Sequence, residues 1–260
     1  MTALWNSFKI AFSMYSKIPM PQSEWTKENM RYVMCFLPVI GAVIGALVYG
    51  WAVLAAKFGI IGEKNFYTAV MILIPVAVTG GIHLDGFLDT SDALSSWQTQ
   101  EKRLEILKDS RAGAFAVLMG CCYFILDFGV YSALNDSVLF RIVCMNFVLS
   151  RALSGLAIVT FRMAKNTGLA ATFSDGAQKK TVAVWMCIYI VVAAILMLWI
   201  HPVYGAIALV TAGLGFAYYR HMAYKNFGGI TGDLAGWFLQ VCELLVPFVL
   251  VLAGFIIGLE

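Results

Sequence analysis

The sequence predicts an all-α fold, a polytopic integral membrane helix bundle with about seven transmembrane helices. Of its 260 residues, 61% are hydrophobic and only 13% are charged, against roughly 25% charged in an average soluble domain. Mean hydropathy is +0.81, and the apolar residues gather in runs about long enough to cross a bilayer. Because lipid offers the backbone no hydrogen-bond partners, these runs should be helices.

Seven apolar runs are separated by short polar segments. They cover approximately residues 32–56, 66–82, 113–134, 138–160, 181–200, 203–219 and 236–258. The second and sixth runs are the shortest. The short connections leave no room for a separate soluble domain, so residues 1–260 are predicted to form a single membrane-embedded domain.

The N-terminal residues 1–18 are too short and too polar to span a bilayer. They mix aromatic and aliphatic side chains with Lys9 and Lys17, which is typical of a helix lying in the membrane interface. Pro19 and Pro21 are expected to end this helix. We therefore expect residues 1–31 to form a cytoplasmic or interfacial N-terminal segment.

The distribution of Lys and Arg predicts the orientation of the chain. Fourteen of the eighteen lie at the N-terminus or in the connections on the same side of the predicted bundle. Only Lys57 and Lys64 lie on the other side, and Arg141 and Arg151 fall within a span. The N-terminus and the acidic loop 83–112 are therefore predicted to be cytoplasmic, with the C-terminus outside.

Charge and cysteine content exclude two other classes of function. A net charge of +3 is too small to indicate nucleic acid binding, and no basic-aromatic run accompanies it. The six cysteines lie in apolar segments and form no Cys-x-x-Cys pair. We interpret them as core or lipid-facing residues rather than disulfides or metal ligands.

Acidic side chains are concentrated in the segment 79–92, although the whole chain has only fifteen. Asp85, Asp89 and Asp92 follow one another at i, i+4 and i+7, which places them on one face of a helix. Like charges this close repel, so a divalent cation with oxygen ligands is expected to complete the site. His83 precedes the first of them by two residues and is a candidate member of the site.

Two glycines open this acidic segment and a second polar segment follows it. Gly80 and Gly81 allow the backbone to approach a ligand closely. Asp109 is a further candidate metal ligand, and Arg111 offers a fork of donors that suits phosphate. The alternative for Asp109 and Arg111 is an ordinary helix end with mixed charge.

Arg151 lies well inside the fourth span, where an arginine costs about 2.5–3.5 kcal/mol on the translocon scale. Such a residue usually faces a cavity or a charged partner. Asp127 in the third span is one candidate partner. The sequence leaves open whether Arg151 binds an anion or forms a structural ion pair.

A second glycine-rich turn, 228–233, precedes the last span. It echoes residues 80–85 in form, with two glycines, an isoleucine and then an aspartate. Asp233 is therefore a candidate site residue, and the alternative is a helix N-cap. Glu243 follows inside the span, where a carboxylate is costly.

Carboxylates that bind a divalent ion, together with arginines, are the equipment of phosphoryl transfer. No Walker glycine loop, kinase motif or nucleophile elbow is present. These residues favour a membrane enzyme that acts on a phosphorylated substrate at the cytoplasmic side.

These motifs closely resemble those of the cobalamin synthase family, the adenosylcobinamide-GDP ribazoletransferases. The resemblance is carried by Lys17-Ile18-Pro19-Met20-Pro21, by residues 80–92, by 104–111 with Gly113, by Ser150-Arg151, and by 228–233 with Glu243. They occur in order from about residue 5 to residue 245.

The resemblance implies a reaction, a cofactor and a location. A hydroxyl of α-ribazole, or of its 5′-phosphate, attacks the cobinamide-linked phosphate of adenosylcobinamide-GDP. GMP leaves, and adenosylcobalamin or its 5′-phosphate forms, as the final step of nucleotide-loop assembly. Mg²⁺ is the implied cofactor, and the multi-pass protein is implied to lie in the cytoplasmic membrane of a prokaryote, with the lipid bilayer around it.

We assign roles within this resemblance as a hypothesis. Metal ligands are Asp85, Asp89, Asp92 and Asp109. The catalytic set is Asp85, His83, Asp89 and Arg111, where either His83 or one of the carboxylates takes the hydroxyl proton. Substrate or phosphate contacts are assigned to Arg111, Arg151, Ser110, Gly80, Gly81 and Asp233.

Two alternatives remain from the sequence. CDP-alcohol phosphotransferases share the logic, but their full Asp-x-x-Asp-Gly-x-x-Ala-Arg pattern is missing here. An ion-coupled transporter would carry its acids near the membrane midplane on broken helices, whereas these acids lie at the cytoplasmic edge. The sequence leaves open the oligomeric state, a homo-oligomer included, the number of metal ions and the preferred form of the acceptor.

Overall fold

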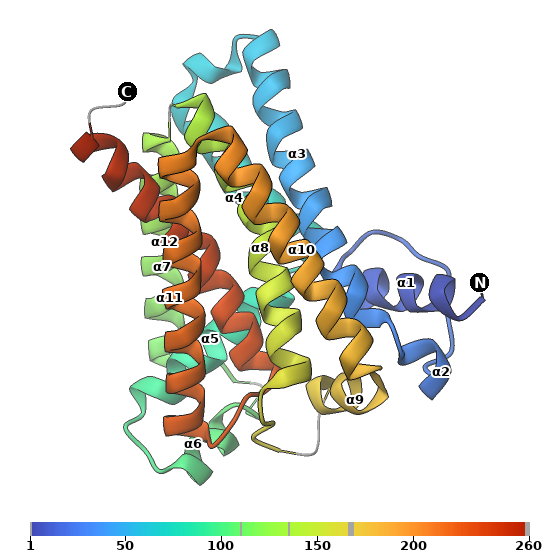
Figure 1. The fold of residues 1–260 in the computed structure, drawn as a ribbon. Helices are drawn as coiled ribbons and strands as arrows, with labels where there is room; N and C mark the ends of the chain where they lie inside the picture. Colours follow the sequence, from blue (N-terminus) through green and yellow to red (C-terminus); the bar gives the residue numbers. More distant parts are fainter. Residues whose placement is uncertain (1, 110, 135, 166–168, 258–260) are drawn as a thin grey trace.

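The computed structural model describes residues 2–109, 111–134, 136–165 and 169–257. Every regular element in them is a helix (Figure 1). The α-helices are α1 Thr2–Tyr15, α2 Lys27–Met30, α3 Leu37–Lys57, α4 Lys64–Thr79, α5 Ile82–Ser95, α6 Gln100–Ile106, α7 Ala114–Ala133, α8 Ser137–Thr160, α9 Leu169–Gly176, α10 Lys179–Ile200, α11 Pro202–Phe227 and α12 Gly232–Ile257. Two short 3₁₀ helices, η1 Val33–Phe36 and η2 Ile60–Gly62, flank α3. The predicted all-helical class is confirmed.

The number of spans agrees with the prediction. Six described helices are long and apolar enough to cross a membrane, namely α3 with its preceding turns, α7, α8, α10, α11 and α12. The pair α4 and α5 supplies a seventh if it is taken as one broken span. One boundary differs: α11 continues to Phe227, past the predicted end at residue 219, so Arg220 and Lys225 lie on its last turns.

Helix α8 forms the centre of the bundle, with α3, α10 and α12 packed around it. Glycines let α3 approach it closely, because a Cβ at Gly41 or Gly45 would overlap the backbone of Phe147 or Cys144. In contrast, α10 exposes a long row of apolar side chains, among them Val184 and Ile195. An apolar exterior around a packed interior is what a lipid solvent requires.

A sharp bend separates α4 from α5. The two helices meet at 95°, across Gly80 and Gly81, which both adopt the left-handed conformation with φ of 65° and 80°. This region of backbone space is accessible to glycine without strain. With 14 residues, α5 is too short to cross a bilayer alone. We therefore treat α5 as a helix lying outside the spanning segments, across one end of the bundle.

The N-terminal helix α1 lies beside the bundle (Figure 1). It buries Ile10, Ala11 and Phe12 against the protein and leaves Leu4 and Trp5 more than half exposed. Exposed aromatic and aliphatic side chains on a helix that flanks the spans are consistent with the predicted interfacial position.

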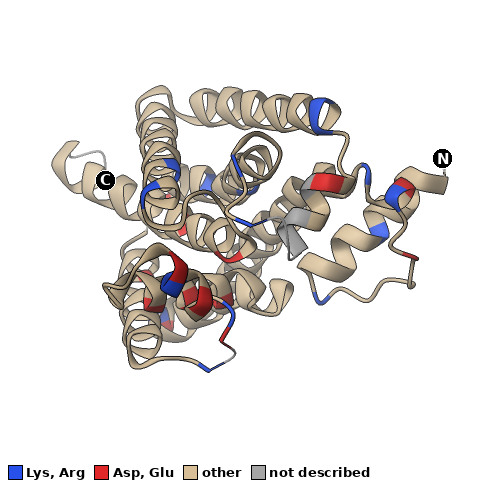
Figure 2. Ribbon diagram, turned by 90° about the horizontal axis from the view of Figure 1, so that it is seen from below, with Lys and Arg blue, Asp and Glu red and all other residues tan. Residues whose placement is uncertain are grey.

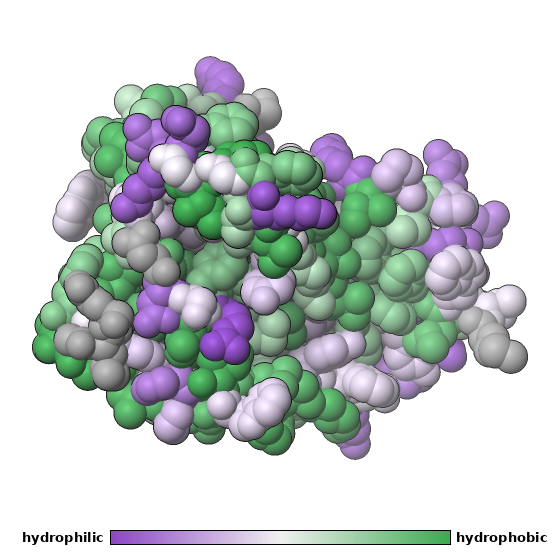
Figure 3. All heavy atoms as spheres, turned by 90° about the horizontal axis from the view of Figure 1, so that it is seen from above, coloured by the Kyte–Doolittle hydropathy of each residue, from purple (hydrophilic) through white to green (hydrophobic). Residues whose placement is uncertain are grey.

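Charged residues collect at the end of the bundle that carries α5 and α6. Seen from this end, several acidic residues gather in one group with basic residues among them, and further basic residues lie around the group (Figure 2). The opposite end shows apolar residues over much of its surface (Figure 3). The segment 83–112, predicted as an acidic loop, is mostly helical, because it contains α5 and α6. We call the end of the bundle that carries α5 and α6 the acidic end.

Candidate active site

The acidic residues of α5 come together as the spacing predicts. Asp85 is exposed, and Asp89 and Asp92 are half-buried on the same helix. Burial, and then the negative charges of Asp85, Asp233 and Asp92, raise the pKa of Asp89 to about 6. Like charges disfavour the ionised form of a neighbour. The four carboxylates therefore share one electrostatic environment, to which a cation would bind favourably.

Two glycines bring the N-terminus of α12 against α5. A Cβ at Gly86 would come within 2.7 Å of the Asp233 carbonyl oxygen, and one at Gly236 within 3.1 Å of the His83 carbonyl oxygen. The two segments that the sequence singled out, 80–92 and 228–233, thus meet at a close helix crossing. Gly86 and Gly236 are needed for this close approach of the two helices, whether or not a ligand binds there.

Asp233 is not the N-cap of α12, which was the alternative to a role in the site. The hydroxyl of Thr231 accepts a hydrogen bond from the Leu234 amide at 3.2 Å, so Thr231 caps α12. The same hydroxyl donates to the Asp233 carboxylate at 3.4 Å. The Asp233 side chain lines a cavity.

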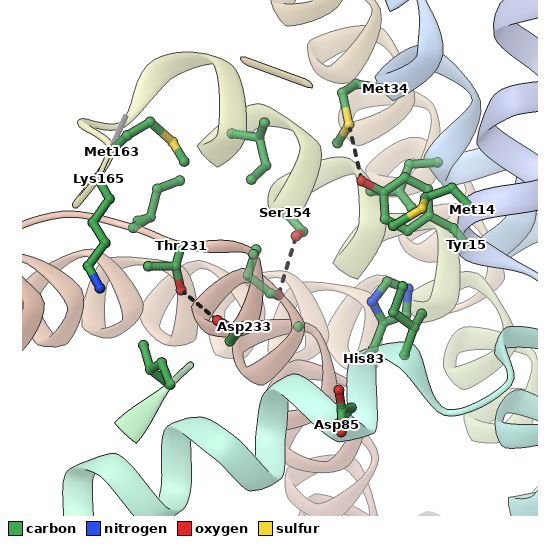
Figure 4. A pocket seen from close by; sticks show the side chains of 18 of the residues that line it. Met14, Tyr15, Met34, His83, Asp85, Ser154, Met163, Lys165, Thr231 and Asp233 are labelled. Atoms are coloured by element: carbon green, nitrogen blue, oxygen red, sulfur yellow. Dashed lines mark hydrogen bonds between the residues drawn. The ribbon is translucent and has the colours of Figure 1, made fainter. Parts of the chain in front are cut away.

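This cavity has a volume of about 520 Å³ and lies between α1, α3, α5, α8 and α12 (Figure 4). Its size is in the range of small-molecule sites. The polar side chains that line it are His83, Asp85, Lys108, Ser154, Lys165, Thr231 and Asp233. Three predicted site residues, His83, Asp85 and Asp233, therefore share one cavity.

Lys165 lines the cavity although it belongs to none of the motifs in the sequence. A parallel bridge between Met163 and Ile230 ties its segment to the start of α12, and its Nζ donates to the Leu104 carbonyl at 2.8 Å. Burial, and then neighbouring Lys108, lower the pKa of Lys165. No spacing pattern marks a lysine in a loop as a site residue, and only the bridge places it.

His83 is buried behind Asp85 and stacks on Tyr15, with ring centroids 5.9 Å apart. Burial, and then the charge of Arg151, lower the pKa of His83 to about 3. The imidazole is therefore neutral near neutral pH. Its Nε2 atom is buried without a hydrogen-bond partner among the described residues, and the neutral ring lines the cavity.

Arg151 pairs with Glu243 and not with Asp127. The fully buried guanidinium contacts the Glu243 carboxylate, which also accepts a 2.8 Å hydrogen bond from the Ser150 hydroxyl. Arg151 does not line the cavity. This arrangement favours the structural ion pair over the anion-binding role, although Nε and Nη2 lack partners among the described residues.

Asp109 and Arg111 engage each other on the surface. Arg111 donates from Nε and Nη2 to the two Asp109 oxygens at 3.0 and 2.7 Å, and this pairing holds the pKa of Asp109 at about 2. Neither side chain lines the cavity, whereas neighbouring Lys108 does. Ser110, which was assigned a phosphate contact, lies outside the described residues. The metal role of Asp109 and the phosphate role of Arg111 stay predictions.

The remaining predicted residues lie at the edges of the site. Asp92 faces Gly113, where a Cβ would overlap its carboxylate, so the acidic face of α5 extends toward the start of α7. Gly80 packs on the Lys17 side chain, and Gly81 borders open space. These two glycines set the direction of α5, and a phosphate contact at either one stays a prediction.

Matches to known proteins identify the family of the chain. A model of the family described as cobalamin-5-phosphate synthase matches residues 7–251. The chain belongs to the cobalamin-5-phosphate synthase family. It is 47% identical to the adenosylcobinamide-GDP ribazoletransferase of Lachnoclostridium phytofermentans over 252 residues, 95% of this chain and 94% of the relative. The enzymes of the same name from Clostridium perfringens and Geobacillus thermodenitrificans are 33% and 31% identical, over 94% and 95% of this chain and 96% and 95% of theirs.

No solved structure matches the chain. Family membership confirms the resemblance drawn from the motifs and places the chain among membrane transferases of cobalamin biosynthesis. It sets aside the transporter and the CDP-alcohol phosphotransferase. We take the cavity at the acidic end of this protein as its candidate active site.

The few carboxylates of this site suit an ion such as Mg²⁺, which does not require the protein to supply all of its ligands. No group of three or more His, Cys, Asp or Glu side chains is arranged around a metal position in the part of the chain that the structure describes. Mg²⁺ usually keeps several waters and takes one or two carboxylates plus substrate phosphates. Asp85 and Asp89, with Asp233 across the helix crossing, offer carboxylates of this kind.

Proposed function

We propose that this protein joins adenosylcobinamide-GDP to α-ribazole or its 5′-phosphate, with Mg²⁺ as cofactor. The observation that carries the proposal is the cavity at the acidic end, which Asp85, Asp233, Lys108 and Lys165 all line. Carboxylates suited to a divalent ion beside lysines suited to phosphate are the requirements of phosphoryl transfer. The names of the relatives supply the substrates.

The proposed reaction is a displacement at phosphorus. A ribose hydroxyl oxygen of the acceptor forms a bond to the cobinamide-linked phosphorus. The bond from that phosphorus to the oxygen bridging the two phosphates breaks, and GMP leaves with the bonding electrons. The hydroxyl proton passes to a base on the protein. No oxidant or further reactant is required.

The residues divide the work as follows. Asp85 and Asp89, with Asp92 and Asp233 nearby, hold the Mg²⁺, which would neutralise the pyrophosphate oxygens and the leaving group when bound. Lys108 and Lys165 hold phosphate oxygens from the other side of the cavity. One of these carboxylates or His83 accepts the hydroxyl proton, and the lowered pKa of His83 favours a carboxylate in this role.

We further infer that the acidic end faces the cytoplasm. Most Lys and Arg residues flank this end, whereas Lys57 at the end of α3 and Lys64 at the start of α4 lie at the other. Nucleotide-activated substrates and Mg²⁺ are available on that side of the membrane. This orientation places the site where both substrates arrive.

Substitution of Asp85 or Asp89 by asparagine tests the function. We expect GMP release by purified protein to fall about 10²-fold, as when an electrostatic contact to the reacting phosphate is removed. The Mg²⁺ concentration for half-maximal rate should also rise. Turnover and Mg²⁺ dependence are measured together, with adenosylcobinamide-GDP and α-ribazole as substrates.

Glu63→Gln is the matched control, because Glu63 is an exposed acid outside the acidic end. It should leave both quantities unchanged. Full turnover of Asp85→Asn and Asp89→Asn with unchanged Mg²⁺ dependence would exclude the metal role. Absence of GMP release by the unmodified protein with either acceptor would exclude the proposed function itself.

A further inference from the structure

One wall of the cavity carries no charged side chain (Figure 4). The charged residues that line the cavity belong to α5, to the start of α12 and to the segments around Lys108 and Lys165, where Leu104, Leu107 and Met163 lie beside them. The uncharged wall is formed by α1, η1, α3 and α8, through Met14, Tyr15, Met34, Leu37 and Ile158. We call these five residues the apolar lobe. None of them carries a charge.

The few polar atoms at the apolar lobe are already engaged. The Tyr15 hydroxyl contacts the Met34 sulfur at 3.9 Å, and the neighbouring Ser154 hydroxyl donates to the Ala235 carbonyl at 3.4 Å. A ligand group bound here would find little to hydrogen-bond. Because an unsatisfied buried polar group costs about 1–3 kcal/mol, the lobe favours a group with few polar atoms.

The substrates of the proposed reaction offer three large groups, and only one suits the lobe. Guanine carries several donors and acceptors on its edges, which the lobe would leave unpaired. The corrin ring bears many amide side chains and is far larger than the lobe. The dimethylbenzimidazole base of ribazole is flat, mostly hydrocarbon and carries two methyl groups. Methionine side chains adapt their shape to such a ligand and contact aromatic rings favourably.

We propose that the apolar lobe is the binding site for the base of the acceptor nucleoside. This assignment rests on the proposed function. His83 lies between the lobe and Asp85 (Figure 4), so a base seated against Tyr15 and Met34 directs its ribose toward His83 and the carboxylates. The guanine of the donor is then bound outside the lobe, on the far side of the phosphates.

Separate KM values for the two substrates test the assignment. In Ile158→Phe, the larger ring fills part of the lobe. We expect the KM for α-ribazole to rise about 10-fold or more, since one methylene of misfit is worth roughly 10–200-fold. The KM for adenosylcobinamide-GDP should change less than about 2-fold. Ile195→Phe makes the same substitution at an exposed position of α10, away from the cavity, and is the control that keeps both values near those of the unmodified protein.

A labelling experiment covers the case in which Ile158→Phe fails to fold. Unmodified protein in lipid nanodiscs is irradiated with α-ribazole that carries a diazirine on its base. Label on the peptides with Met14, Tyr15, Met34 or Ile158, suppressed by excess α-ribazole, supports the assignment. The assignment is overturned if the label appears on other peptides, or if a donor that carries the diazirine on its guanine labels these peptides. A rise in the KM for adenosylcobinamide-GDP in Ile158→Phe also overturns it.

The outcomes separate the two proposals. If the unmodified protein releases no GMP from adenosylcobinamide-GDP, the proposed function fails. If it turns over but Ile158→Phe leaves the acceptor KM unchanged, the function stands and the assignment of the lobe fails.

Discussion

Arg151 is the largest side chain with less than 2% exposure among the described residues, and its burial depends on Glu243. A charge inside a membrane bundle is tolerated when an opposite charge and hydrogen bonds accompany it. The Ser150 hydroxyl supplies one such bond to Glu243. The pair lies behind His83, where the charge of Arg151 acts on the imidazole. A structural ion pair thus also influences a cavity residue.

Breaking this pair should destabilise the protein strongly. We expect Glu243→Gln to lower the free energy of unfolding by about 3–5 kcal/mol, because it leaves the Arg151 charge buried and unpaired. Chemical denaturation in detergent micelles measures the change. Arg151→Met combined with Glu243→Gln should recover most of the loss. A double variant as unstable as Glu243→Gln alone would show that the two side chains are not coupled.

At the scale of elements, the crossing of α5 and α12 builds the site. Gly86 and Gly236 allow two helices to approach with backbone against backbone, which brings Asp85 and Asp233 to one cavity. The bend at Gly80 and Gly81 turns α5 across the end of the bundle, where its acids face that cavity. The glycine pattern in the sequence is therefore explained by a helix crossing and a bend.

Gly86→Ala should separate these two helices. Its Cβ would meet the Asp233 backbone at 2.7 Å, and such overpacking typically costs about 1–3 kcal/mol. We expect lower thermal stability together with a large loss of GMP release. Gly50→Ala is the matched control, because Gly50 lies within α3 with nothing inside 4 Å of a new Cβ. Equal activity in both variants would argue against the crossing as the basis of the site.

At the scale of the whole molecule, charge separates the two ends of the bundle. Acidic and basic residues together mark the end that carries the cavity (Figure 2). The spans between the ends expose apolar side chains, as lipid requires. The candidate site thus lies at the end of the bundle that carries the charged residues.

The orientation has a direct test by cysteine labelling. Glu105→Cys on α6 and Glu63→Cys before α4 are both exposed positions. In intact right-side-out vesicles, a membrane-impermeant maleimide should label Glu63→Cys and spare Glu105→Cys until the vesicles are opened. The unmodified protein reports background from its own cysteines. The reverse pattern would contradict a cytoplasmic acidic end.

The sequence by itself determined the helical class, the approximate spans and the acidic segment, because hydropathy and residue spacing are local properties of the chain. It also found His83, Asp85 and Asp233, which lie in compact polar motifs. Only the tertiary structure decided which side chains meet. Glu243 rather than Asp127 pairs with Arg151, Asp109 turns to Arg111, and Lys165 joins the cavity through the bridge at Ile230. These choices depend on the rotation and crossing of packed helices, and residues distant in sequence carry no signal of that geometry.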